Sequence, residues 1–224
     1  MSAEILDQLK QAILSYDAEE AERCARRVVE EKLDPLAAIA AMTAAIRSVG
    51  DGFECGDLWL PDLIGAASAM KAASPVIEDE ITRAGMTREC LGSVVVGTVF
   101  GDIHDIGKNM ISTLLVANGF VVHDVGVNAT ADQFIQAVER YQPDLLAMSS
   151  LMTMTAYEQS KVIEGLDRSG LRQGGVRVMV GGAAITESFA NEIGADGYDA
   201  SAPGAVNLAR RLIGLEEAQE SERR

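Results

Sequence analysis

The sequence predicts an α/β protein: an N-terminal four-helix bundle over residues 1–88, followed by a five-stranded parallel-sheet domain over residues 89–224. Up to about residue 84, apolar residues recur at three- and four-residue spacing without strand signals, as in amphipathic helices. From residue 91, short β-branched runs alternate with helical segments, which is typical of a parallel sheet covered on both faces. With 224 residues, of which 48% are hydrophobic, the chain can bury one large core or two small ones.

The N-terminal helices have recognisable starts and ends. Asp17 is placed to cap the second helix, with Glu20 three positions on. Pro35 follows a turn and begins the third helix. Four antiparallel helices with short connections form a bundle. They are expected at residues 5–14, 17–33, 35–49 and 61–84.

The second half contains five strand signals and five helical segments in alternation. Gly119 is expected to end the first of these helices, and Thr130 with Gln133 forms a capping box for the second. This alternation predicts a flavodoxin-like (Rossmann-type) doubly wound domain, in which ligands bind beyond the carboxyl ends of the strands. The strands are expected at residues 93–98, 120–125, 144–149, 176–180 and 195–198. The helices are expected at residues 108–118, 131–141, 156–169, 186–193 and 204–213.

The charge, the cysteines and the hydropathy exclude several classes of protein. A net charge of −15, shared by both halves, argues against a nucleic-acid partner, which needs a clustered basic surface. Cys24, Cys55 and Cys90 are far apart and odd in number, which indicates a reduced, cytoplasmic protein. The amino terminus lacks a basic stretch followed by an apolar run, and no segment has 18 uninterrupted apolar residues, so no membrane insertion is expected.

The loop after the first predicted strand, residues 101–109, carries His104 between two carboxylates. A phosphate-binding P-loop is excluded, since five residues separate Gly101 from Gly107 and Asn109 stands where Ser or Thr is needed. A response-regulator phosphorylation site is excluded as well, because the third strand ends in Ser149 and Ser150 instead of aspartate.

His104 has two interpretations from the residues alone. One is a hydrogen-bonded loop histidine without a ligand. The other is a metal ligand, because Asp102 can accept the proton of one ring nitrogen and leave the second nitrogen free for a transition metal such as cobalt. With His123 as the only other histidine, a zinc site made by the protein alone is hard to assemble, whereas a metal carried by a cofactor needs one ligand.

These motifs resemble the corrinoid-binding domains of cobalamin-dependent methyltransferases, including the cobalamin-binding module of methionine synthase. The family pattern is Asp-x-His-x-x-Gly, then Ser-x-Leu, then Gly-Gly. Each element occurs here at the end of a predicted strand and in the same order. They are Asp102-Ile103-His104-Asp105-Ile106-Gly107, Ser149-Ser150-Leu151 and Gly181-Gly182.

The resemblance implies roles for individual residues. His104 would bind cobalt from below in place of the cofactor's own dimethylbenzimidazole, whose tail would thread down the sheet. Asp102 and Thr155 would relay protons to His104, with Thr155 standing where methionine synthase has serine. For each glycine and alanine, a plain tight turn is the alternative role. The implied cofactor contacts are Gly101, Asp102, Ile103, His104, Asp105, Ile106, Gly107, Ser149, Leu151, Thr153, Gly181, Gly182 and Ala202.

The helical half is also similar to the family. Residues 49–63 resemble the cap that covers the reactive upper face of the corrin, with Phe53, Leu60 and Leu63 at its apolar covering positions. The alternative is that these three side chains belong to the bundle core. The resemblance covers residues 5 to 214 and leaves out the charged tail at residues 216–224, which is expected to fray.

The resemblance implies a stand-alone corrinoid protein of methanol, methylamine or methoxyaromatic methyltransferase systems. Such a protein carries a methyl group as methylcobalamin, through Co(I), Co(II) and Co(III) states, and is not itself the catalyst. The expected partners are a substrate-specific methyltransferase, a second methyltransferase with a folate or thiol acceptor, and a reductive activase. A corrinoid-dependent sensor or regulatory module and an adenosylcobalamin mutase subunit are the rivals.

Overall fold

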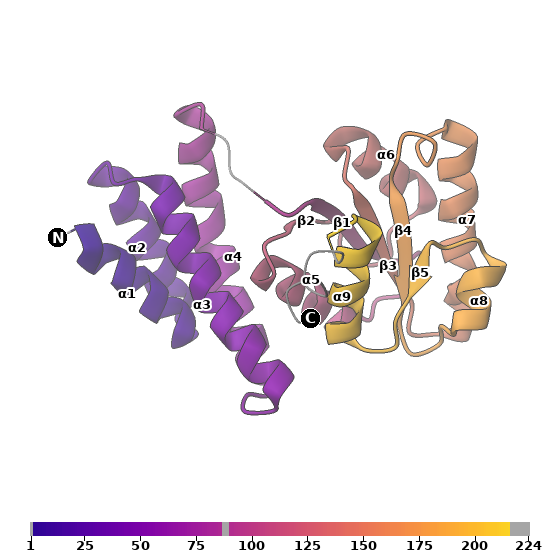
Figure 1. Cartoon of the computed structure of the whole chain (residues 1–224), viewed down its shortest axis with the longest axis horizontal. Helices are drawn as coiled ribbons and strands as arrows, with labels where there is room; N and C mark the ends of the chain where they lie inside the picture. The colour runs from indigo at the N-terminus through magenta and orange to yellow at the C-terminus, as the bar shows by residue number, and fades with distance from the viewer. Residues whose placement is uncertain (1, 87–89, 216–224) are drawn as a thin grey trace, which may run out of the picture. The chain divides into compact units, whose positions relative to one another are not determined.

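A computed structural model of the chain describes residues 2–86 and 90–215. It has two compact units: the first ends at Cys90 and also includes Val116–Gly119, and the second comprises Leu91–Leu115 and the chain from Phe120 on. Figure 1 shows helices alone in the N-terminal unit and a sheet flanked by helices in the other. The predicted fold class is therefore confirmed. The tail at residues 216–224 lies outside the described residues, as do residues 87–89 around the predicted boundary.

The helical unit contains α1 (Ser2–Leu14), α2 (Ala18–Glu30), α3 (Pro35–Cys55) and α4 (Leu60–Arg83). The Asp17 side chain accepts a hydrogen bond from the backbone N–H of Glu20 at 2.9 Å, which confirms the predicted cap. α2 packs against α1 and α4, and α3 packs against the same two helices. Burial of apolar side chains stabilises this bundle. The largest of them are Ile5, Leu9, Ile13, Met42, Ile46, Leu63 and Ile77.

The third helix is longer than predicted. Its expected end was residue 49, before two glycines, but α3 continues to Cys55 and ends at Gly56, whose φ of 81° is left-handed. Gly52 is tolerated inside the helix because Leu58 packs on it, and a Cβ at position 52 would lie 2.9 Å from Leu58 Cδ1. The later contact with Leu58 therefore compensates for the weak helix propensity of glycine.

α3 is also the one helix in the described chain that is long and apolar enough to cross a membrane, by length and composition only, over Pro35–Phe53. In the structure 39% of that window is buried, and core helices of bundles pass the same test. The absence of membrane insertion stays a prediction.

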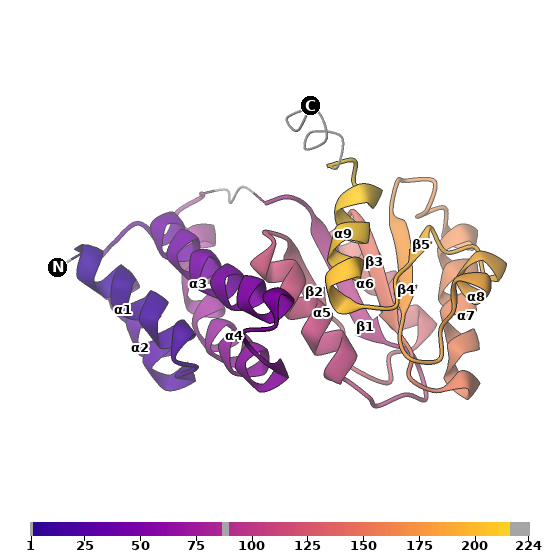
Figure 2. The same cartoon turned by 60° about the horizontal axis from the view of Figure 1, so that its bottom comes forward.

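The second unit is a five-stranded parallel sheet in the order β2-β1-β3-β4-β5. Figures 1 and 2 show α6, α7 and α8 over one face and α5 and α9 over the other. The strands are β1 (Ser93–Thr98), β2 (Val121–Asp124), β3 (Leu145–Ser149), β4 (Arg177–Gly181) and β5 (Gly197–Tyr198). The helices are α5 (Ile106–Ala117), α6 (Ala131–Tyr141), α7 (Thr153–Ser169), α8 (Glu187–Glu192) and α9 (Ala202–Leu212).

The predicted elements all occur, with shifted ends. The Thr130–Gln133 capping box forms, and Gly119, with φ of 90°, follows the end of α5. α5 and α7 begin two and three residues earlier than predicted, and β5 is shorter. The early helix starts matter because they place Ile106 and Thr153 on the first turns beside the loops that follow β1 and β3.

β1 and β3 are adjacent, and the helices that follow them cover opposite faces of the sheet (Figure 2). Their last residues, Thr98 and Ser149, are paired in register. The loops after these two strands therefore diverge at the carboxyl edge of the sheet, which is the place where doubly wound folds bind ligands.

Candidate cofactor site

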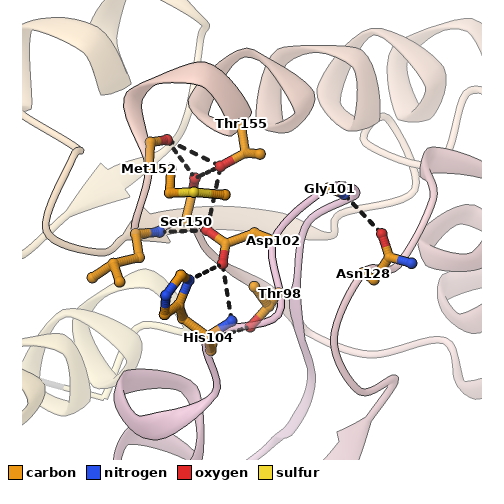
Figure 3. Close-up of polar contacts among 9 residues, drawn as sticks. Thr98, Gly101, Asp102, His104, Asn128, Ser150, Met152 and Thr155 are labelled. Carbon is orange, nitrogen blue, oxygen red and sulfur yellow. Dashed lines mark hydrogen bonds and ion pairs between the residues drawn. The ribbon is translucent and has the colours of Figure 1, made fainter.

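His104 and Asp102 form the centre of the site, in the loop between β1 and α5 (Figure 3). The ring Nδ1 of His104 lies 2.7 Å from Asp102 Oδ1, and the backbone N–H of His104 donates to the same oxygen at 2.9 Å. Asp102 is fully buried, whereas the His104 side chain is 50% exposed. A carboxylate can only accept, so Nδ1 carries a proton, and in the neutral ring Nε2 then keeps its lone pair for an external ligand.

Asp102 is held as an anion. Burial opposes its ionisation, but hydrogen bonds from the backbone N–H groups of His104 and Leu151 and from the His104 ring lower its pKa from 3.8 to about 2. The Leu151 N–H, from the loop after β3, donates to Oδ2 at 2.7 Å. The negative charge of Asp102 thus holds a proton on His104 Nδ1. The same carboxylate joins the loop after β1 to the loop after β3.

The ligand loop is braced from two sides. The Thr98 hydroxyl donates to the His104 carbonyl at 3.0 Å. Asn128, in the loop that follows β2, makes two hydrogen bonds to the ligand loop. Its Oδ1 accepts from the Gly101 N–H at 2.8 Å, and its backbone N–H donates to the Asp102 carbonyl at 2.9 Å. Gly101 has φ of 80°, a conformation that favours glycine. These contacts restrict the backbone that carries His104.

Two buried hydroxyls lie behind Asp102 on the side away from His104 (Figure 3). Thr155 Oγ1 lies 3.3 Å from Asp102 Oδ2 and 2.8 Å from Ser150 Oγ. The structure therefore brings together His104, Asp102 and Thr155, the three residues that the resemblance implies for a proton relay. That they relay protons stays a prediction.

Large apolar side chains are exposed next to this polar centre. Ile103 is 73% exposed and Ile106 60%, in the ligand loop and the first turn of α5, and Leu151 is exposed after β3. Asp105 and Gly107 are exposed as well. Exposed apolar side chains close in sequence or by hydrogen bonding to a half-exposed imidazole are typical of a binding surface for a mostly apolar ligand.

A narrow apolar channel runs between the sheet and the helices α5 and α9. It has about 320 Å³ of empty space, including open solvent, and Ser149 and Gly181 line it at the carboxyl ends of β3 and β4. A Cβ at Gly181 would meet only the Asp199 carbonyl, at 3.6 Å. The lining of the channel is mostly apolar. Its lining is Val96, Lys108, Ile111, Ala147, Met148, Ser149, Met179, Val180, Gly181 and Ala205.

Three other predicted tail contacts do not line the channel in the described chain: Thr153, Gly182 and Ala202. Thr153 is exposed at the start of α7, and Ala202 is buried at the start of α9. Gly182 has φ of 115°, and a Cβ there would lie 2.0 Å from the Ser150 carbonyl oxygen. The close approach of the Ser150 backbone requires glycine at position 182, and a cofactor contact there stays a prediction.

The predicted cap residues lie in the helical unit. Phe53 is half-buried near the end of α3, Leu60 is half-buried at the start of α4, and Leu63 is fully buried. Complete burial of Leu63 fits the alternative of a bundle-core residue. Whether Phe53 and Leu60 cover a cofactor is left to experiment.

Three residues of the site were not predicted from the sequence: Ser150, Thr98 and Asn128. Ser150 was given no role in the site, although a second hydroxyl beside a motif serine is a signal. Thr98 and Asn128 have no motif that marks them, because their contacts join segments far apart in the sequence. Among residues 2–86 and 90–215, no three His, Cys, Asp or Glu side chains are grouped to hold a metal ion.

Comparison with known families agrees with this geometry. Residues 92–207 match a family described as a B12 binding domain, and residues 5–78 match a second family of the same description. The first match contains the loops that follow β1 and β3, and the second covers most of the four helices, from residue 5 in α1 to residue 78 in α4.

Similar proteins cover almost the whole chain. Trimethylamine corrinoid protein 2 of Methanosarcina acetivorans is 39% identical over 211 residues, which are 94% of this chain and 97% of that protein. A corrinoid protein of Desulfitobacterium hafniense is 37% identical over 216 residues, 96% of this chain and 100% of that protein. The crystal structure of the methanol:cobalamin methyltransferase complex of Methanosarcina barkeri contains a similar chain, with a TM-score of 0.79, 27% identity, and coverage of 95% and 81%. The chain therefore belongs to the corrinoid proteins with B12-binding domains, and its cofactor is cobalamin or a related corrinoid.

Proposed function

We propose that this protein carries a methyl group on corrinoid cobalt between two methyltransferases, with His104 as the lower axial ligand. The observation that supports it most is the His104–Asp102 pair. The Nδ1 proton is held at 2.7 Å by a buried carboxylate, while the ring is half exposed beside an apolar rim. A corrinoid supplies cobalt that can accept and release a methyl group; the protein supplies position and ligand tuning.

The residues of the chain have distinct tasks in this proposal. Asp102 keeps His104 in one tautomer and orientation, so that Nε2 faces the ligand position. Ile103, Ile106 and Leu151 exclude water around that position. The network behind Asp102 would move a proton to or from the histidine as ligation changes, with Thr155 as its first hydroxyl.

The displaced nucleotide tail would enter the channel beside Ser149 and Gly181. The apolar lining and the open space at Gly181 support this placement. The helical domain, proposed to span residues 1–88, would cap the opposite face of the corrin through Phe53 and Leu60, leaving residues 89–224 as the corrinoid-binding domain. Because a covered methyl group cannot reach another enzyme, the cap would have to move aside.

The names of the similar proteins support a place in methylamine or methanol metabolism. They include a trimethylamine corrinoid protein, a dimethylamine corrinoid protein and a methanol:cobalamin methyltransferase complex. We propose a substrate-specific methyltransferase as the donor partner and a second methyltransferase, with a folate or thiol acceptor, as the receiver. A reductive activase would restore the active cobalt state, and all of them would act in the cytoplasm.

The test is reconstitution with cob(II)alamin followed by electron paramagnetic resonance. We expect about one equivalent bound, with the splitting of a protein nitrogen on the cobalt signal. His104→Ala should remove that splitting, whereas His123→Phe should keep it, because His123 stacks on Tyr141 at β2, away from the ligand loop. An unchanged splitting in His104→Ala contradicts the ligand assignment, and failure to bind a corrinoid contradicts the function.

Transfer is tested separately. The reconstituted protein, reduced to Co(I), is incubated with purified methanol, monomethylamine, dimethylamine or trimethylamine methyltransferase and its substrate. Methylation by one of these enzymes, followed by visible absorbance, is the expected result. A protein that binds corrinoid through His104 but is methylated by none of them argues for a regulatory role instead.

A further inference from the structure

Ser150 and Thr155 form a pair of buried hydroxyls behind the carboxylate of Asp102. Ser150 is 0% exposed and Thr155 7%. Their oxygens lie 2.8 Å apart, which is the usual length of an O–H···O hydrogen bond. Ser150 comes from the loop after β3 and Thr155 from the first turn of α7, so two elements converge on the same point.

The acceptors around the pair decide where the two protons point. Besides the other hydroxyl, Ser150 has one acceptor, the Met152 carbonyl at 3.1 Å. Thr155 has the same carbonyl at 3.0 Å and Asp102 Oδ2 at 3.3 Å.

The Met152 carbonyl is already used at the start of α7. It accepts from the backbone N–H groups of Thr155 and Ala156, at 3.2 and 3.1 Å, which match its two lone pairs. An ionised carboxylate is the stronger acceptor. The arrangement that satisfies both hydroxyls is therefore a chain in which Ser150 donates to Thr155 and Thr155 donates to Asp102.

We propose that Ser150 is a positioning residue that turns the Thr155 hydroxyl toward Asp102 and thereby tunes how strongly His104 binds cobalt. The inference rests on the proposed role of His104 as axial ligand. A hydroxyl that receives a hydrogen bond becomes a better donor, so Ser150 strengthens the donation of Thr155 to Asp102.

The effect reaches His104 through the shared carboxylate. Each further donor to Asp102 weakens its pull on the Nδ1 proton of His104, 2.7 Å from the other oxygen. Without the Ser150 hydroxyl, Thr155 loses the donor that polarises its O–H group, so its hydrogen bond to Asp102 weakens. Asp102 then pulls harder on the Nδ1 proton, Nε2 becomes richer in electrons, and His104 binds cobalt more tightly.

The experiment compares Ser150→Ala, Thr155→Val and the double variant in protein reconstituted with cob(II)alamin. The readout is the ratio of histidine-bound to histidine-free cobalt, taken from the nitrogen splitting of the electron paramagnetic resonance signal. Ser160→Ala is the matched control, because its hydroxyl donates to the Tyr157 carbonyl on the same helix. In the cofactor-free protein, the ¹⁵N chemical shift of His104 Nδ1 gives a second readout.

We expect Ser150→Ala to raise that ratio roughly two- to ten-fold, the equivalent of about one hydrogen bond, and Thr155→Val to raise it at least as much. In the Thr155→Val background, Ser150→Ala should add nothing, since its effect passes through Thr155. Ser150→Cys, which nearly keeps the side-chain volume but has a weak donor, should resemble Ser150→Ala.

Two results would overturn the proposal. One is an unchanged ratio and an unchanged Nδ1 shift in Ser150→Ala or Ser150→Cys, with nitrogen splitting present in the wild type. The other is an equal effect of Ser150→Ala with and without Thr155. A wild-type protein without nitrogen splitting would instead reject the ligand role of His104, so the two failures are distinguishable.

Discussion

The Leu151 backbone N–H donates to the carboxylate of Asp102 at 2.7 Å, although the two residues are 49 positions apart. The contact joins the loop after β3 to the loop after β1, at the edge where the adjacent strands end. Asp102 therefore has two tasks, orienting His104 and holding the neighbouring loop. A change at Asp102 should affect both, which separates it from a residue that only contacts the cofactor.

Asp102→Asn should weaken corrinoid binding by roughly 10- to 100-fold, the usual cost of losing the partner of a metal-bound histidine. The amide lacks the charge that holds the Nδ1 proton, and its NH₂ group cannot accept from Leu151 or His104. Equilibrium titration with cob(II)alamin measures the dissociation constant. Asp132→Asn, an exposed carboxylate on α6, is the control and should bind as the wild type does. Equal affinity in both variants would remove Asp102 from this role.

The stability of the cofactor-free protein should depend on Asp102 at low pH. Its folded pKa is lowered to about 2, against 3.8 as the ordinary value. The ionised carboxylate contributes about 2 kcal/mol, present above pH of about 4 and lost as the pH falls toward about 2. Urea unfolding of wild type and Asp102→Asn across this range measures it. We expect the difference in unfolding free energy to shrink as the pH falls; a constant difference contradicts the lowered pKa.

Gly181 and Gly182 should respond differently to alanine. Gly181→Ala fits the fold, since its Cβ meets only a carbonyl at 3.6 Å, but it narrows the channel and should weaken binding of a corrinoid with its nucleotide tail. Binding of cobinamide, which lacks that tail, should be unchanged.

Gly182→Ala should instead destabilise the protein by roughly 1–3 kcal/mol or more, through backbone strain at φ of 115° and the clash with the Ser150 carbonyl. Melting temperatures of both variants separate the two effects. If Gly181→Ala weakens cobinamide as much as cobalamin, the tail does not use the channel.

Phe53→Ala tests the proposed cap. If Phe53 shields the methyl-bearing face, the variant should lose bound methylcobalamin to light faster than the wild type, because the apolar cage is open. If Phe53 is only bundle core, the variant should lose roughly 3 to 5 kcal/mol of stability with normal photolysis. Ile77→Ala, a buried α4 residue, is the control for a pure core loss. A normal photolysis rate with a large stability loss would end the cap hypothesis.

The sequence by itself determined the order of the elements, the parallel sheet and the ligand loop. The spacing of apolar residues separates helices from buried strands. A helix of the bundle buries one apolar stripe, whereas a strand of a covered parallel sheet buries both of its faces. The Asp-x-His-x-x-Gly motif marked His104 and Asp102 because both act within one short loop. The end of α3 was wrongly predicted, since local propensity at Gly52 is outweighed by packing of Leu58. The starts of α5 and α7 were placed two and three residues too late.

The tertiary structure alone decided which distant groups meet. Leu151 contacts Asp102 only because β1 and β3 are adjacent, and strand order has no local signature in the sequence. The Thr155–Asp102 contact depends on the same adjacency, and before the structure only the family resemblance implied it. The same applies to Ser150, whose hydroxyl is useful only where the first turn of α7 brings Thr155 to 2.8 Å. Position 182 likewise has to be glycine, because a side chain there would clash with the Ser150 backbone. Hydrogen bonds depend on positions in space, so a motif can name the ligand while the fold decides how it is tuned.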